Sequence, residues 1–174
     1  MSDKSTIDSN NYYYIVISMA RIHSYGITHI NNATEKEAIE YLIDNDSSFI
    51  NPDKESRKAI MELMGIPNNF SRAFDLLKIS GKSNLDEDLT ISNPKDVTLI
   101  ELKTTKKKLV NNPRGFFFGA TENEFDLAKQ FEDQFLFCFV SLHPESRSYS
   151  LLTLMELESL IRTKRTQYQI NLVP

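Results

Sequence analysis

Residues 88–103 read DLTISNPKDVTLIELK, and this stretch decides how the 174-residue chain is interpreted. Because side chains alternate between the two faces of an extended strand, Glu101 and Lys103 share a face at the end of an apolar segment. Residues 93–96 have the composition of a turn. A hairpin around this turn would bring Asp88 level with Glu101, so that both carboxylates lie beside the lysine.

This grouping suits chemistry at a phosphate. Mg²⁺ binds one or two carboxylates, leaves room for water and phosphate oxygens, and lowers the pKa of a bound water. We expect Asp88 and Glu101 to hold Mg²⁺, for which Mn²⁺ would substitute, and the backbone carbonyl of Leu102 to supply a further oxygen ligand. Lys103 would orient the attacking water or stabilise the pentavalent phosphate.

Asp88 followed by E-L-K-T-T at residues 101–105 resembles the D…E-x-K core of the PD-(D/E)XK nuclease superfamily. The resemblance covers about the second half of the chain, including a loop, a helix and a buried strand after the E-x-K strand. It implies an α/β fold with a restriction-endonuclease-like mixed central sheet flanked by helices. It also implies that Asp88, Glu101 and Lys103 are catalytic. Glu87, not proline, precedes Asp88.

The choice of the first carboxylate is open. Asp86 and Asp75 compete with Asp88, and Asp75 begins another apolar stretch, although the expected hairpin register favours Asp88. Many nucleases of this superfamily carry an accessory acid on a helix. Glu55 and Glu62 are candidates for that position, with Glu62 preferred.

The resemblance implies a hydrolase that acts as a DNA endonuclease in restriction or host defence, and that cleaves as a homodimer. The basic residues after the proposed site are candidates for contacts with DNA phosphates: Lys106, Lys107, Lys108 and Arg114. One alternative is a non-catalytic nuclease-fold protein that binds nucleic acid or a partner protein. Another is a structural α/β domain with these charges at its surface.

Composition sets further bounds. The chain is 40% hydrophobic and 25% charged, as in ordinary globular proteins, and its net charge of −4 weighs mildly against nucleic-acid binding. No apolar run approaches the length of about 20 residues that spans a membrane. The N-terminus lacks the pattern of a secretory signal, so we expect a cytoplasmic location. Cys138 is expected to be a core residue and not a nucleophile.

Periodicity and turn residues predict an N-terminal helical segment or subdomain over residues 1–70 and a nuclease-like core over residues 71–174. The predicted helices are 12–25, 34–44, 52–64, 121–131 and 153–164. The predicted strands are 76–80, 88–92, 97–103, 116–118, 135–142 and 149–152, with a further edge strand at 168–172.

Overall fold

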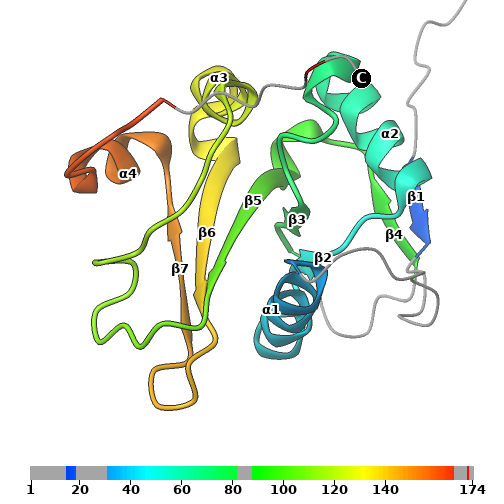
Figure 1. Cartoon of the computed structure of the whole chain (residues 1–174). Helices are drawn as coiled ribbons and strands as arrows, with labels where there is room; N and C mark the ends of the chain where they lie inside the picture. Colours follow the sequence, from blue (N-terminus) through cyan, green and yellow to red (C-terminus); the bar gives the residue numbers. More distant parts are fainter. Residues whose placement is uncertain (1–14, 19–30, 82–87, 167–171, 173–174) are drawn as a thin grey trace, which may run out of the picture.

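A computed structural model describes residues 15–18, 31–81, 88–166 and 172 (Figure 1). The helices are α1 (Asn31–Asn45), α2 (Lys54–Met64), α3 (Glu122–Phe131) and α4 (Leu154–Leu160). The strands are β1 (Ile15–Ser18), β2 (Phe49–Ile50), β3 (Leu76–Ile79), β4 (Asp88–Ile91), β5 (Val97–Thr105), β6 (Phe135–Ser141) and β7 (Ser148–Leu152).

The main sheet has five strands in the order β2-β3-β5-β6-β7. Strands β5 and β6 are parallel, and the other neighbouring pairs are antiparallel. Helix α3 makes the crossover between β5 and β6, which parallel neighbours require. The prediction of an α/β fold with a mixed sheet flanked by helices is therefore confirmed at this general level.

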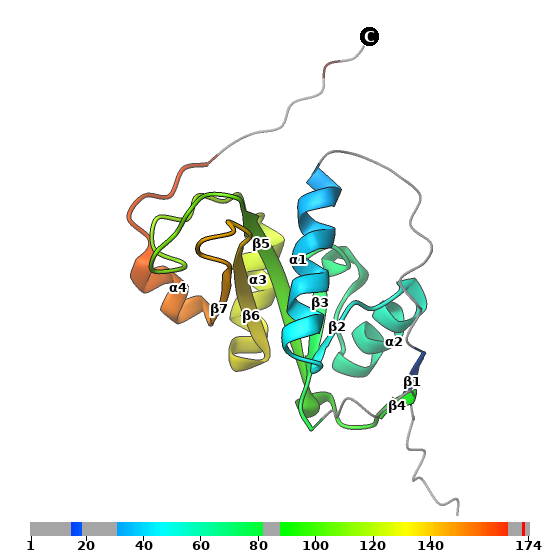
Figure 2. The same ribbon diagram turned by 90° about the horizontal axis from the view of Figure 1, so that it is seen from below.

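Alternation along β5 separates the two faces of the sheet. Leu99 packs in one core cluster with residues of α2, α3 and α4, whereas Ile100 packs in a second cluster with Ala38 and Leu42 of α1. Helices α1 and α3 accordingly lie on opposite sides of β5 (Figure 2). Strand β6 is almost fully buried, as predicted for a central strand with an apolar run.

Local sequence explains where the helices begin and end. The carboxylate of Asp53 accepts a hydrogen bond from the backbone N–H of Ser56 and caps α2, which ends at Gly65 with a φ of 67°. Thr121 caps α3 through the backbone N–H of Glu124. Helix α4 begins with a reciprocal capping box, and its end at Leu160 lies short of the predicted 164.

Three sequence predictions are wrong. The hairpin between 88–92 and 97–103 does not form, because β3 and β6 occupy both edges of β5, and β4 pairs with β1 in a separate two-stranded sheet. Residues 116–118 are not a strand, because Phe116 and Phe118 pack their rings against Phe139 of β6 and the segment joins no edge of the sheet. Within the predicted helix 12–25, Ile15–Ser18 is a strand, and the remaining residues lie outside those described.

The elements of residues 31–66 join the same core as the rest of the chain. Strand β2 extends the main sheet, α1 covers one of its faces, and Ile60 and Met61 of α2 are buried in the cluster on the other face. No helix in the described part of the chain is long and apolar enough to cross a membrane. The expected edge strand at 168–172 falls outside the described residues except for the exposed Leu172.

Candidate functional site

The end of β5 carries a buried ionic cluster. Glu101 and Lys103 lie on the face of the sheet that α3 covers, as the alternation of the strand predicts. The Lys103 ammonium donates hydrogen bonds to Glu101 Oε1 at 2.7 Å and to Glu124 Oε2 at 2.8 Å. All three side chains are at most 11% exposed. The cluster therefore joins two acids and one lysine in surroundings that exclude most water.

Glu101 is the least compensated member of this cluster. Its Oε1 accepts from Lys103, but its Oε2 is buried and has no hydrogen-bond partner. Burial raises the pKa of Glu101 to about 9, and the nearby charge of Asp75 adds to the increase. The attraction of Lys103 lowers this pKa but does not cancel the two larger effects. Without a further cation, Glu101 holds a proton at neutral pH.

Asp75 is the second acid at the end of β5. It directly precedes β3, and its Oδ2 accepts a hydrogen bond from the backbone N–H of Leu102 at 2.7 Å. The pairing of β3 with β5 ends at Leu76 and Ile100. Beyond this pair, the Leu102 amide binds the side chain of Asp75 and not the backbone of a longer β3. Burial raises the pKa of Asp75, while the Leu102 hydrogen bond and the charges of Lys103 and Arg57 work against this increase.

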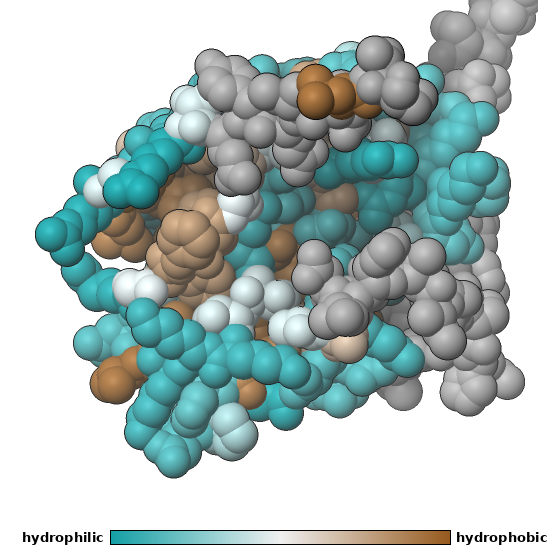
Figure 3. All heavy atoms as spheres, in the orientation of Figure 1, coloured by the Kyte–Doolittle hydropathy of each residue, from teal (hydrophilic) through white to brown (hydrophobic). Residues whose placement is uncertain are grey.

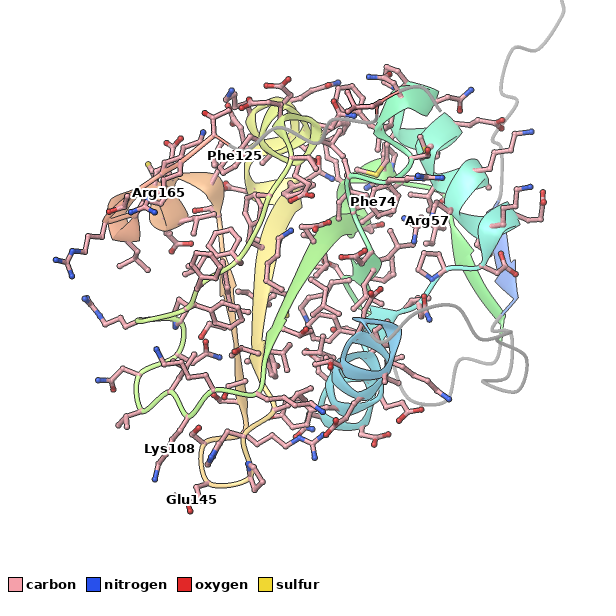
Figure 4. The ribbon with its side chains drawn as sticks, viewed as in Figure 1. Arg57, Phe74, Lys108, Phe125, Glu145 and Arg165 are labelled. Atoms are coloured by element: carbon pink, nitrogen blue, oxygen red, sulfur yellow. The ribbon has the colours of Figure 1, made fainter. Side chains whose placement is uncertain are left out.

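Arg57 of α2 fixes the backbone at Asp75. Its guanidinium donates to the carbonyl oxygens of Phe74 at 2.5 Å and Asp75 at 2.9 Å, and lies 4.5 Å from the centre of the Phe74 ring (Figure 4). An arginine that donates to two neighbouring carbonyls and also stacks on a ring has little freedom to move. Helix α2 therefore sets the position of Asp75 relative to β5.

Glu124 connects α3 to the cluster. It is the third residue of α3, where its backbone N–H binds the Thr121 hydroxyl and its Oε1 accepts from the same hydroxyl at 3.1 Å. Burial alone would lower the pKa of Lys103, but the charges and hydrogen bonds of Glu101 and Glu124 raise it above its ordinary value. Lys103 is therefore held as a cation between the carboxylate of Glu124 and the carboxyl group of Glu101.

Glu35 of α1 approaches Asp75 from the opposite face of the sheet. Burial raises the pKa of Glu35, and the charge of Asp75 raises it further. Glu35 lies in the wall of a cavity of about 420 Å³, together with Leu102 and Lys106. In the sequence, Glu35 is only one residue at the start of a predicted helix. Its proximity to Asp75 depends on how α1 packs across β5.

The structure answers part of the question about the first carboxylate. It places Asp75 beside Glu101, whereas the backbone of Asp88 pairs with Ser18 in the separate sheet. The side chain of Asp88 and the whole of Asp86 lie outside what the structure describes.

The candidates for a helical accessory acid are not brought to the cluster. Glu55 is exposed at the start of α2, and Glu62 forms a surface ion pair with Lys58. Cys138 is a buried core residue, as expected, and burial raises its pKa to about 12, so that its thiol stays protonated.

The basic residues that the sequence assigned to DNA binding all lie on the surface. Lys106, Lys107, Lys108 and Arg114 are exposed on the segment that follows β5. Lys108 forms an ion pair with Glu145, which lies in the loop between β6 and β7 (Figure 4). The other three form no ion pair with another described residue.

The donor atoms of the cluster meet only part of what a metal ion requires. Within the described ranges, no group of three or more histidine, cysteine, aspartate or glutamate side chains is arranged to hold a metal. Lys103 occupies Glu101 Oε1 and the Leu102 amide occupies Asp75 Oδ2, which leaves Glu101 Oε2 as an unpartnered buried oxygen. Carboxylate oxygens of this kind are the ligands that hard divalent cations prefer.

No protein family model, no curated protein and no solved structure matches the chain. The function of the cluster is therefore argued from its own residues and geometry.

Proposed function

We propose that this chain is a Mg²⁺-dependent phosphodiesterase that hydrolyses DNA, built on a restriction-endonuclease-like core. The observation that carries the proposal is the buried cluster at the end of β5, in which Glu101 keeps an unpartnered carboxylate oxygen between Asp75 and Lys103. In this proposal Asp75 is the first metal-binding carboxylate, a role that the sequence analysis assigns to Asp88.

The charges of the cluster are hard to explain by stability alone. Asp75, Glu101 and Glu124 share Lys103, and the charge of Arg57 also acts on Asp75. Burying ionised groups costs several kcal/mol each unless they are well paired. The pKa of about 9 for Glu101 arises first from burial and then from the charge of Asp75, and the attraction of Lys103 does not offset the two. Strongly shifted acids of this kind occur most often at functional sites.

A divalent cation would be held on the side of Glu101 that faces Asp75. Glu101 Oε2, the carboxylate of Asp75 and the Leu102 carbonyl are the donors that would hold it, with Glu35 as an acid near Asp75. When bound, Mg²⁺ would supply positive charge at the phosphate and a more acidic water.

Lys103 is suited to an electrostatic role. Its raised pKa keeps the ammonium charged, so it would act by orienting a water and by stabilising negative charge on phosphate oxygens, and not as a general base. Glu124 would hold the ammonium in position from α3, and Glu101 would hold it from the metal side.

The order of elements agrees with what the sequence resemblance implies. Strand β5 with the E-x-K residues is followed by a loop, by α3 and by the buried strand β6. Lys106 and Lys107, exposed directly after β5, and Arg114, exposed further along the same loop, support an anionic polymer as substrate. Hydrolysis by water would leave a 5′-phosphate and a 3′-hydroxyl. Cleavage of both strands would need two sites, so the proposal includes a homodimer acting in restriction or defence.

Plasmid nicking and cleavage test the proposal. Purified protein is incubated with modified and unmodified plasmid in Mg²⁺, Mn²⁺ or EDTA. We expect metal-dependent cleavage that falls by about 10²-fold or more in D75N, E101Q and K103M, because each removes a ligand or the catalytic charge. D88N is the matched comparison, and E62Q on the surface of α2 is the control; both should cleave like the wild type.

A binding measurement separates the roles. Mg²⁺ should raise the melting temperature of the wild type and of K103M, but not that of E101Q, since only E101Q loses a ligand. If the wild type cuts no plasmid with either metal and Mg²⁺ leaves its melting temperature unchanged, a non-catalytic protein becomes the better interpretation. If D88N is inactive and D75N is active, the assignment of the first carboxylate is reversed.

A further inference from the structure

The segment between β5 and α3 begins and ends at the ionic cluster. It leaves β5 after Lys103 and returns to α3 before Glu124, and these two side chains are hydrogen-bonded to each other. In between, residues 106–121 form neither helix nor strand and run alongside β6 and β7 (Figure 1). The two ends of this loop therefore lie at the proposed catalytic site.

Two phenylalanines attach the loop to the sheet. The rings of Phe116 and Phe118 each lie 5.0 Å from the ring of Phe139 in an edge-to-face arrangement. Phe139 is the β6 neighbour of Lys103 in the parallel register, so this anchor is next to the catalytic lysine. Asn112 adds hydrogen bonds to the carbonyl oxygens of Phe139 and Ser148. The loop is thus held in place at both points.

Phe117 projects away from this anchor. Because alternate side chains of an extended segment point in opposite directions, the anchoring of Phe116 and Phe118 turns Phe117 outward, where it is 95% exposed. Val110 on the same loop is 85% exposed. In Figure 3, apolar atoms gather over the part of the surface where the loop crosses the sheet.

The charges around the loop favour one kind of occupant. Lys106, Lys107 and Arg114 are exposed on the same segment and form no ion pair with described residues. Cations together with an outward aromatic ring match a nucleic-acid strand, which offers phosphates to the cations and the flat face of a base to the ring. A base inside a duplex is already stacked on both sides, so the ring requires an unpaired base.

We propose that Phe117 stacks on an unpaired base of the nucleic acid that lies across the cluster, so that the preferred substrate is single-stranded or locally opened DNA. This inference rests on the proposed function, which it narrows to a class of substrate. Phe116 and Phe118 anchor the segment that carries the ring to Phe139, the neighbour of Lys103, and Arg114, three residues before Phe117, binds a neighbouring phosphate.

The chain contains no tryptophan, which allows a direct test. Phe117→Trp and Val110→Trp each introduce a single fluorophore at an exposed position of the same loop, and neither replaces a core or catalytic residue. A mixed-sequence single strand is titrated in EDTA, so that the signal needs neither metal nor cleavage. We expect the fluorescence of F117W to be quenched by stacking and that of V110W to change little.

Affinity provides the second readout. Fluorescence anisotropy with labelled single-stranded and duplex DNA should show that F117A binds the single strand about tenfold more weakly, while F117Y and F117W restore binding. V110A should change the affinity by less than about twofold, as an exposed residue outside the contact. Fully paired duplex should bind the wild type and F117A equally.

The outcomes are distinguishable. Equal responses of F117W and V110W, or unchanged single-strand affinity in F117A, would overturn the stacking role even if plasmid cleavage is observed. Failure of the wild type to bind any nucleic acid overturns it as well. A dimer in sedimentation velocity that F117A converts to a monomer would assign the ring to a second copy of the chain and reject the base. Stacking without cleavage would support this inference and reject the phosphodiesterase.

Discussion

At the scale of single residues, the unusual group is Glu101. A carboxylate that is 5% exposed, with one oxygen on Lys103 and one without a partner, is costly to ionise in the metal-free protein. Asp75 and Glu124 increase that cost through their charges. The residue therefore links the pH dependence of stability to the proposed binding of a cation.

Replacing Glu101 with glutamine should flatten the pH dependence of stability in EDTA. The pKa is about 9 in the folded protein against an ordinary value of 4.5, so the folded state keeps a proton that the unfolded state releases. Stability is then full below the lower pKa and falls as pH rises, by up to about 1.4 kcal/mol per pH unit between the two values. Lys103 is charged in both states throughout this window and does not oppose the trend.

Urea denaturation at about pH 5, 6, 7 and 8 measures this slope. Between pH 5 and pH 8, the free energy of unfolding of E101Q should decrease less than that of the wild type. Some decrease should remain in E101Q, because the pKa of Asp75 is also raised. E62Q, at an exposed position of α2, is the control. Parallel curves for E101Q and wild type would contradict the prediction.

At the scale of elements, three pieces from different parts of the chain assemble the site. Strand β5 supplies Glu101 and Lys103, the start of β3 supplies Asp75, and α3 supplies Glu124. Strand β3 stops opposite Ile100, which leaves the Leu102 amide to the Asp75 carboxylate. The mismatch in strand length, β3 being shorter than β5, therefore makes the site possible.

Replacing Arg57 with methionine should destabilise the protein and disturb Asp75. The guanidinium donates to two carbonyl oxygens before β3, and hydrogen bonds with charged donors contribute about 1.5–3 kcal/mol. We expect a loss of about 2 kcal/mol in urea denaturation, together with a reduced rate of DNA cleavage. K58M, the next residue of α2, loses only a surface pair with Glu62 worth about 0.5 kcal/mol. Equal losses in the two variants would show that Arg57 does not hold β3.

At the scale of the whole molecule, the sheet unites early and late parts of the chain. Helix α1 packs Ala38 and Leu42 against Ile100, and its Tyr41 ring meets the Tyr149 ring of β7 edge to face at 6.3 Å. Helix α2 contributes to the other cluster. The described part of residues 31–66 has no core that is separate from the sheet.

Unfolding should therefore occur in one cooperative transition. Far-UV circular dichroism follows the helices. Fluorescence of the seven tyrosines, which include the packed pair Tyr41 and Tyr149, follows their surroundings, so the two urea curves should share one midpoint. Leu42→Ala on α1 should lower both midpoints together, with a loss of about 2–5 kcal/mol for a fully buried leucine. Two separate midpoints, or a shift of only one, would indicate an independent N-terminal unit.

Local pattern was sufficient for much of the fold. The alternation of Val97–Thr105 and the apolar run of Phe135–Ser141 identified the two central strands. Capping boxes located the starts of α3 and α4, and Gly65 located the end of α2. The same alternation placed Glu101 and Lys103 on one face. These features depend on neighbours in the chain, and the spacing of side chains reports them directly.

Only the tertiary structure decided which strand lies beside β5, and with it which acids meet Glu101. The turn residues at 93–96 favour a hairpin between β4 and β5. In the structure β3 pairs with that edge of β5, so Asp75 and not Asp88 lies beside Glu101. Glu35 and Glu124 arrive through helix packing on opposite faces. Strand pairing and helix docking depend on burial summed over the whole core, and no local stretch of sequence encodes that sum.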